Sequence, residues 1–441
     1  MLAVACGALA GAKPILGLGV VFGIAFVGLV LFDLTLGVYV FGAAIYIETI
    51  PAIERAVSLT KLMGVLLALA WLAAALRRRA DRRALTADHP RLVGLMVLFV
   101  AWAWLSTLWS EDAGVVPGTV LRFALNFSLL PIVYAALRTP RNAQILIVCM
   151  IAGAVLSAAI GFLNPAASTS ADAGRLTGAG VNSNQLGLFM VGSAVLAATL
   201  AMSRAFSGVT RLLLAAASVI CLLALLKTGS REALLGLFVA MIVGTVFAGR
   251  GRRALAMLLT TVAILSAAFY IAAFAPPDIR ERVTQLEGGS GREDIWRVGV
   301  RMVRANPVLG VGAGNYIVSS KHYYLGPGVV RRPEYIIDDP KEAHNIYLNV
   351  LAELGVVGLA AFLAIVGSML ACGVMAARAF AQRGDTSMEI VSRGVCAALC
   401  GVLAGSFFSS QLYSKPLWLM LALCPALLAI ARDPRQTRQI T

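Results

Sequence analysis

The chain has 441 residues, of which 59% are hydrophobic and only 13% are charged. A soluble globular protein has about twice that charged fraction, so the composition excludes this class and predicts a multi-pass membrane protein. The formal net charge of +15 invites a nucleic-acid reading. The distribution argues against it, because 19 of the 37 Lys and Arg residues lie in every second short connection between apolar segments. This pattern follows the positive-inside rule, by which cytoplasmic cations orient the protein and need bind no partner.

Apolar segments of about 20 residues, the length that crosses a bilayer, recur along the chain. From residue 59 onward eleven are predicted, at 59–76, 93–110, 118–137, 144–163, 184–202, 212–227, 232–249, 254–275, 350–377, 389–410 and 416–431. Residues 14–50 add two apolar stretches that are split at Asp33. One broken crossing there gives twelve spans with both termini in the cytoplasm, and two crossings give thirteen. We favour about twelve, in an all-α fold.

The pattern divides the chain into three parts. Residues 1–275 hold the N-terminal transmembrane helices, and residues 276–343 form one large hydrophilic loop. Residues 344–441 hold the C-terminal transmembrane helices and a short cytoplasmic tail. Because the Arg-rich connections are cytoplasmic, the large loop is expected on the opposite side of the membrane.

Cysteine and histidine usage predicts neither disulfides nor a metal site. All seven cysteines lie in apolar stretches, and none lies in the large loop. Only three histidines occur, and no cluster has the spacing that a zinc site needs. We therefore expect no metal and no other cofactor. The N-terminus has no cation before Lys13, so it lacks the charged start of a cleaved signal peptide.

The large loop contains a predicted amphipathic helix at Gly291–Ala305. Its arginines and its apolar residues fall on different faces by helical spacing: Arg297, Arg301 and Arg304 on one, and Ile295, Val298 and Met302 on the other. Helices of this type tend to lie in the membrane interface. We therefore expect the arginines to contact lipid headgroups.

A second helix start is predicted at the end of the loop. Asp339 before Pro340, with Glu342 three residues after the Asp, resembles an N-cap with proline at the first helical position. This would place His344 in the second turn, with Tyr347 on the same face. Imidazole is well suited to act as a general base near neutral pH. An interfacial histidine that only hydrogen-bonds to headgroups or loop carbonyls is the alternative.

Several arginines are candidates for binding an anion. Arg231 follows Ser230, a plausible N-cap, and an anion at that helix start would meet the guanidinium and free backbone N–H groups together. Arg122 lies several residues inside its span, where an unpaired charge is costly and often functional. Arg292 precedes the amphipathic helix, and Arg175 lies in the Ser/Ala/Gly-rich connection 164–181. An arginine that snorkels to the membrane interface is the alternative for Arg231. Several arginines converging on one outer-surface site would suit a diphosphate better than a carboxylate.

Three motifs carry a resemblance to a known family. His344 to Gly355 is a His-x10-Gly motif, and Arg231-Glu-Ala-Leu-Leu is an Arg-x3-Leu motif. Gly291-Arg-Glu-Asp-Ile-Trp, followed by Asn306-Pro-Val-Leu-Gly-Val-Gly, resembles the segment that introduces a large periplasmic loop. In this order, the three resemble the O-antigen ligases and the related O-antigen polymerases of Gram-negative bacteria. The motifs cover about residues 182–358.

The resemblance implies an inverting, metal-independent glycosyl transfer at the periplasmic face of the bacterial inner membrane. A preassembled glycan on undecaprenyl diphosphate would pass to a sugar hydroxyl of lipid A–core. His344 would be the catalytic base, and Arg231 and Arg292, with Arg122 and Arg175, would bind the diphosphate. The partners implied are this donor, this acceptor and membrane lipids, with no nucleic acid. Further candidate substrate-binding residues are Asn182, Asn184 and Tyr347.

Two other functions remain open from the sequence. An O-antigen polymerase shares the donor and the motifs, and the single large loop in the last third of the chain favours a ligase over it. A lipid-linked-glycan transporter or flippase should line a central cavity with charges at mid-membrane depth. Here the candidate residues are expected at the outer face instead.

Overall fold

The computed structural model describes residues 14–47, 59–77, 85–163, 174–248 and 291–433, except 327, 329, 332 and 339, together with single positions between 253 and 280. Within these residues the regular structure is helical and no strand is present. An isolated bridge pairs Gly178 with Val181. The predicted all-α class is confirmed.

Eight helices of the described residues are long and apolar enough to cross a membrane. Each falls on a predicted span: α6 (Pro90–Leu105, extended by η2, Ser106–Leu108), α7 (Val116–Ala136), α8 (Pro140–Leu163), α9 (Ser183–Met202), α10 (Gly208–Thr228), α16 (Ile346–Gln382), α17 (Thr386–Gly405, extended by η8, Ser406–Phe408) and α18 (Lys415–Arg432). The chain is therefore a multi-pass membrane protein.

The other predicted spans have different outcomes. Two further predicted spans are helices, α4 (Leu59–Arg77) and α11 (Arg231–Phe247), but neither is among the eight that are long and apolar enough to cross a membrane. The predicted span 254–275 lies largely outside the described residues. The break at Asp33 is confirmed, since it separates α2 (Pro14–Phe32) from α3 (Leu34–Ala44) and caps α3. The total of about twelve spans stays a prediction.

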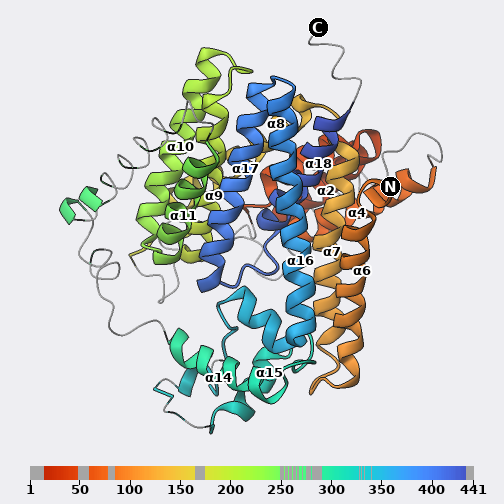
Figure 1. Ribbon diagram of the computed structural model, residues 1–441, viewed down its shortest axis with the longest axis vertical. Coiled ribbons are helices and arrows are strands. Elements are labelled where there is room, and N and C mark those ends of the chain that lie inside the picture. The colour runs from red at the N-terminus through yellow and green to blue at the C-terminus, as the bar shows by residue number, and fades with distance from the viewer. Residues whose placement is uncertain are drawn as a thin grey trace.

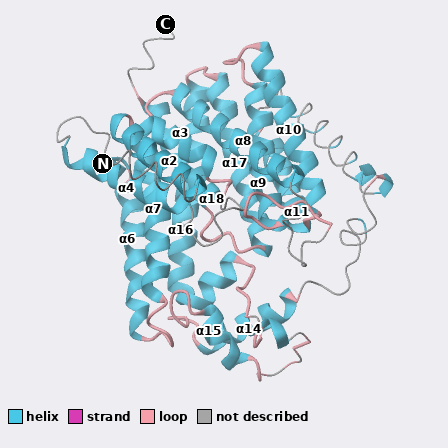
Figure 2. Cartoon of the chain, turned by 180° about the vertical axis from the view of Figure 1, so that it is seen from behind, coloured by secondary structure: helices cyan, strands magenta, loops and turns pink. Residues whose placement is uncertain are grey.

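The helices form one bundle that is built around α18. Nearly every residue of α18 is buried, and its Trp418 packs against Phe127 of α7 and Phe362 of α16. The long helices α6, α7 and α16 run side by side, and α9, α10, α11 and α17 form the neighbouring group (Figures 1 and 2). The short α5 (Leu85–Asp88) leads into α6.

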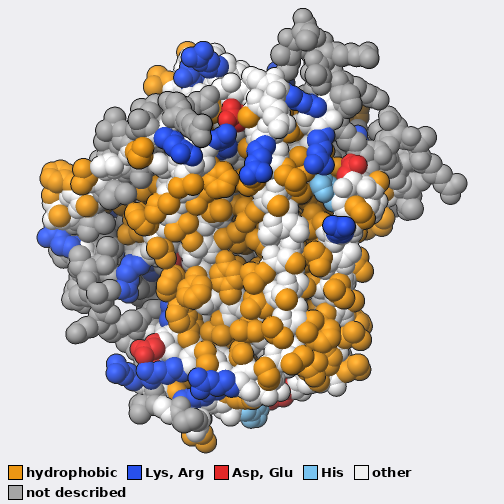
Figure 3. Space-filling view, viewed as in Figure 1, with side chains coloured by type: hydrophobic (Ala, Val, Ile, Leu, Met, Phe, Trp, Pro, Cys, Tyr) orange, Lys and Arg blue, Asp and Glu red, His pale blue; other side chains and the backbone are white. Residues whose placement is uncertain are grey.

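The surface has the polarity of a membrane-embedded bundle. Hydrophobic side chains form a broad band across the face in Figure 3, with Lys and Arg side chains above and below it. Exposed large apolar residues include Leu363 on α16 and Phe238 on α11. Such apolar exposure is stable only when lipid covers it.

The end of the bundle near α14 and α15 is covered by a small helical cap from the large loop (Figure 1). Its elements are α14 (Arg292–Ala305), α15 (Tyr316–Ser320), η6 (Lys321–Tyr323) and η7 (Pro333–Tyr335). The cap has a hydrophobic core of its own, which joins α14 to α15 and to the start of α16. The predicted helix at Gly291–Ala305 is confirmed, with Gly291 as its N-cap.

The predicted location of this amphipathic helix in the membrane interface is wrong for its apolar face. Ile295, Val298 and Met302 are at most 2% exposed and pack within the cap core. Tyr316 of α15 closes the contact, because its hydroxyl donates to the carbonyl of Ile295 (2.8 Å). Residues from α15 and α16 thus occupy the face that the pattern alone would assign to lipid.

Arg301 does not belong to a lipid-facing stripe. Its guanidinium donates to the carbonyl oxygens of Tyr323 and Tyr324 at 2.9 and 2.7 Å, and to that of Gly328 at 2.9 Å. One arginine therefore holds the segment after α15 against α14. Arg304, by contrast, is exposed.

Candidate active site

The turn between α10 and α11 places Arg231 at a helix start. Gly229 ends α10 in the left-handed conformation (φ 57°), which glycine adopts without a Cβ clash. Ser230 then caps α11, because its side chain accepts a hydrogen bond from the N–H of Ala233. The predicted cap is confirmed, and Arg231 is the first residue of α11, with an exposed side chain. An arginine at the start of a helix is a combination that favours a bound anion.

Arg175 lies against the same turn. Its Nε donates to the carbonyl of Thr228 (2.7 Å), and its Nη2 donates to Oδ1 of Asn184 (2.6 Å). A cation at the C-terminal end of α10 is favoured by the helix dipole. Two predicted residues, Arg175 and Asn184, are therefore in direct contact beside the start of α11. Asn182 instead caps α9 by accepting from the N–H of Gln185 (2.9 Å), which is a structural role.

Arg292 reaches the same place from the large loop. It is the first residue of α14, and its Nη2 donates to Oε2 of Glu232 at 2.6 Å. Glu232 follows Arg231 directly and its side chain is 1% exposed, compared with 22% for Arg292. The ion pair thus joins the first turns of α11 and α14. Glu232 was not among the site residues predicted from the sequence.

The predicted helix start before His344 is wrong. α16 begins at Ile346, and its N-cap is Asn345, whose side chain accepts from the N–H groups of Tyr347 and Leu348 (both 3.0 Å). Pro340 lies in an irregular segment, and Asp339 is outside the described residues. His344 therefore precedes the helix, and the helical face predicted for it does not apply.

The backbone of His344 adopts the left-handed region, with φ 46°. For a residue other than glycine this costs roughly 1–2 kcal/mol, and such strain persists only where neighbouring contacts enforce it. Here the indole N–H of Trp296 donates to the carbonyl of Ala343 (2.7 Å), and Asn345 caps α16 on the other side. Contacts of both sequence neighbours thereby hold the backbone at His344 in place.

The electrostatic surroundings keep His344 neutral. Burial, followed by the positive charges of Arg292 and Lys341, lowers the pKa of His344 to about 4. Its Nδ1 lies 3.4 Å from the hydroxyl of Ser410. A neutral imidazole can accept a proton, and an anion that offsets the charge of Arg292 would raise its pKa again.

Arg122 lies near this group without a direct contact to it. Its guanidinium sits over the ring of Tyr413, 5.5 Å from the centroid. Tyr413 is three residues after Ser410, in the segment between η8 and α18. The structure therefore brings Arg175, Arg231 and Arg292 to the start of α11. The charge of Arg292 acts on His344, and Arg122 lies next to the segment that touches His344.

A break in α16 explains the glycine of the His-x10-Gly motif. Gly355 has φ 67° and ψ −171° inside the helix. A Cβ there would come within 2.8 Å of the Leu309 amide nitrogen and closer still to the Val308 carbonyl. The freed N–H of Val356 donates to the carbonyl of Pro307 (2.9 Å). The Asn-Pro-Val-Leu-Gly segment thus packs directly against the break in α16.

A second buried carboxylate holds this contact in place. Glu353 is 4% exposed, and it accepts hydrogen bonds from the N–H groups of Gly314 (2.9 Å) and Tyr316 (3.3 Å). Glu353 was not predicted from the sequence either. An acid within an apolar helix was the available signal, since buried charges there are costly and need partners.

Tyr347 contributes to an aromatic wall next to His344. Its hydroxyl donates to the carbonyl of Leu403 (3.0 Å), and its ring lies 6.1 Å from that of Phe407. Trp296 packs on Phe407 and Phe408 at 5.7 and 5.5 Å. Since its hydroxyl is bound within the protein, the structure assigns Tyr347 a packing contact.

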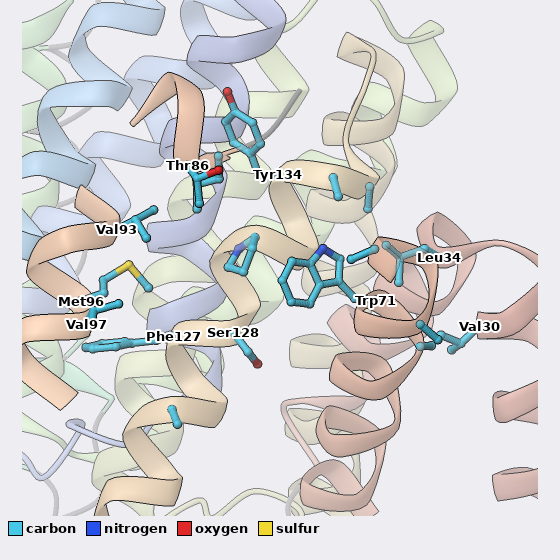
Figure 4. Close-up of a pocket in the computed structure, with 18 of the residues that line it drawn as sticks. Val30, Leu34, Trp71, Thr86, Val93, Met96, Val97, Phe127, Ser128 and Tyr134 are labelled. Atoms are coloured by element: carbon cyan, nitrogen blue, oxygen red, sulfur yellow. The ribbon is translucent and has the colours of Figure 1, made fainter. Parts of the chain in front are cut away.

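A cavity of about 1630 Å³ lies elsewhere, between α2, α4, α6 and α7 (Figure 4). Its walls are mainly apolar, with Trp71, Met96 and Phe127 among them, and Tyr134 lies at one end. None of the predicted site residues lines it. Among the described residues, no group of three or more His, Cys, Asp or Glu could hold a metal ion.

Comparison with known families gives one match, which covers part of the chain. Residues 216–363 match the family model described as O-Antigen ligase. The chain is related to the O-antigen ligase family. Members of this family are glycosyltransferase-like membrane enzymes of glycan biosynthesis, and they include ligases and polymerases. No curated protein sequence matches the chain.

The matched segment of this O-antigen ligase relative holds most of the described site. It runs from the middle of α10 to the first half of α16, so it includes Arg231, Glu232, Arg292 and His344. The family resemblance inferred from the three motifs is confirmed. Arg122 and Arg175 lie outside the matched segment, and their place beside the site comes from the fold.

Proposed function

We propose that this protein is an O-antigen ligase, which transfers a preassembled glycan from undecaprenyl diphosphate to a sugar hydroxyl of lipid A–core. The observation that carries the proposal is the meeting of Arg175, Arg231 and Arg292 with His344 at one end of an apolar bundle. Planar guanidinium groups suit the oxygens of a diphosphate, and a neutral imidazole suits a hydroxyl proton. The groups that would bind the diphosphate and the group that would accept the proton therefore lie in the same region.

The reaction follows from these roles. The acceptor hydroxyl oxygen attacks the anomeric carbon of the donor while His344 takes the hydroxyl proton. The bond between the anomeric carbon and the diphosphate oxygen breaks, and its electron pair leaves with the diphosphate. Attack opposite the leaving group inverts the anomeric centre. The arginines stabilise the negative charge that grows on the diphosphate, and a positioned base contributes roughly 10²–10⁴-fold.

Donor binding would also tune the base. Burial, followed by the charges of Arg292 and Lys341, lowers the pKa of His344 to about 4. A diphosphate bound to Arg292 offsets that charge, so the imidazole becomes a stronger base when the donor is present. Proton uptake is thereby linked to donor binding, which limits unproductive chemistry in the empty site.

The location of the site supports an enzyme more than a transporter. Arg231 and Arg292 each begin a helix, and His344 immediately precedes one. These positions are helix ends, whereas a transporter needs charges at mid-membrane depth. With the Arg-rich connections in the cytoplasm, this end of the bundle would face the periplasm from the inner membrane.

Purified protein in liposomes provides the direct test, with lipid-linked polymeric glycan as donor and lipid A–core as acceptor. We expect His344→Ala to bind the donor and to transfer no glycan. The matched control is His322→Ala, which removes an exposed histidine of the cap and should leave transfer unchanged. Equal transfer by both variants would show that His344 is not the catalytic base.

The polymerase alternative is separated in cells that lack the protein. Loss of lipopolysaccharide banding with accumulated polymeric lipid-linked glycan supports a ligase. Accumulated single repeat units on the lipid carrier would make the protein an O-antigen polymerase. Both outcomes are read from the same extracted lipids.

A further inference from the structure

Glu232 is a negative charge in the middle of a group of arginines. Its side chain is 1% exposed, and burying a carboxylate carries a large desolvation cost unless partners offset it. It also lies next to Arg231, where it would repel an anionic donor. If the side chain only had to fill this buried site, an apolar residue of similar size would stabilise the fold as well or better. The acid therefore requires a specific explanation.

The contacts of Glu232 show what it holds. Oε2 accepts from Nη2 of Arg292 at 2.6 Å, and the side chain of Ser409 also hydrogen-bonds to this carboxylate. A guanidinium has five N–H donors, so the contact through Nη2 leaves donors for an anion. Arg292 is 22% exposed on its side chain. It can face a ligand while Glu232 fixes it from behind.

The backbone that carries Glu232 is packed closely against α17. A Cβ on Gly405, at the end of α17, would come within 2.9 Å of the Glu232 carbonyl oxygen. The first turn of α11 is thus in close backbone contact with α17, and Ser230 caps it. Arg292 comes from the large loop, sixty residues away in sequence. The ion pair is the link by which the transmembrane bundle sets the position of this loop arginine.

We propose that Glu232 is a positioning residue for glycosyl transfer, which holds the guanidinium of Arg292 beside His344. The inference rests on the function proposed above. Charged groups face the imidazole and the ion pair from each packed segment: Arg292 from α14, Lys341 from the segment before His344, and Arg175 from the connection before α9. Glu232 is the acid that pairs with Arg292 in this group, so it also reduces the field of that arginine at His344.

Three variants test the role, each measured for transfer and for hydrogen exchange. Glu232→Gln keeps the shape and removes the charge, and Glu232→Asp keeps the charge on a shorter side chain. The control Glu293→Gln removes an acid whose side chain is 69% exposed and which pairs with Arg297 on the outside of α14. We expect kcat of Glu232→Gln to fall at least about tenfold, equivalent to about 1.4 kcal/mol, with partial recovery in Glu232→Asp.

Hydrogen exchange of the first turn of α14, residues 291–296, separates this inference from the proposed function. Loss of the pair should raise exchange there in Glu232→Gln and leave it unchanged in Glu293→Gln. The acid limb of the kcat profile should also move to lower pH in Glu232→Gln, because Arg292 is then uncompensated. If both variants behave alike in exchange, Glu232 does not position Arg292, even when the wild-type protein transfers glycan. If the wild type transfers nothing and the exchange difference remains, the positioning stands and the ligase function fails.

Discussion

Replacing Gly355 by alanine should damage the protein far more than the size of one methyl group suggests. The break in α16 gives this residue φ 67°, and a side chain in the left-handed region costs roughly 1–2 kcal/mol. The new Cβ would also overlap the Val308 carbonyl and lie 2.8 Å from the Leu309 nitrogen. Both neighbours are backbone atoms, so no side-chain rotation can relieve the clash.

The two penalties add to a measurable loss. Overpacking of this kind costs typically 1–3 kcal/mol, and with the backbone term the free energy of unfolding should fall by about 2–5 kcal/mol. Gly367 is the matched control, because it lies in the same helix and a Cβ there meets nothing within 4 Å. Alanine at that position should stabilise the helix by up to about 1 kcal/mol.

Thermal unfolding of the two variants in the same detergent gives the comparison. Gly355→Ala should have a lower Tm than the wild type, and Gly367→Ala an equal or higher one. We also expect the first variant to lose transfer, since the helical segment before the break begins directly after His344 and Asn345. Equal Tm values for the two variants would mean that the loop segment is not seated on the break.

Three further predictions concern side chains of the site and cap. The pKa of His344 is about 4 when folded and about 6.5 when unfolded, so the folded state disfavours the proton. The contribution of the neutral imidazole to the free energy of unfolding is therefore fully present above about pH 6.5, and about 3 kcal/mol of it is lost as the pH drops to 4. In denaturation assays over this pH range, the stability of His344→Gln should fall less with acid than that of the wild type. Arg231→Lys keeps the charge but not the planar fork, so donor affinity should fall markedly at normal protein levels, and unchanged affinity would make Arg231 an interfacial anchor. Arg301→Lys cannot reach three carbonyls and should speed proteolysis of the cap, whereas exposed Arg304→Lys should not.

Local signals in the sequence were sufficient where one segment decides the outcome. Ser230 caps α11 as predicted, because the cap and the N–H that it binds are three residues apart. The helix at 291–305 was also predicted from its own periodicity. The spans that became α6 to α10 follow from apolar length alone.

Where distant segments compete, the sequence was insufficient. Asp339 and Asn345 are both good capping residues, and α16 starts at the second, where Trp296 holds the adjoining backbone. The amphipathic face of α14 would suit lipid, but Tyr316 occupies it. Glu232 finds its partner sixty residues later, and no periodicity reports such a pair.

The break at Gly355 has a consequence for how the chain is made. The carbonyl of Leu354 accepts from the indole N–H of Trp102 (2.9 Å), and the N–H of Val356 donates to Pro307 (2.9 Å). A backbone group left without a partner in lipid costs several kcal/mol. Both partners precede Gly355 in the chain, and chains are synthesised from the N-terminus. When α16 emerges during biosynthesis, the groups that satisfy its break have already been made, so the helix can enter the bilayer already bent.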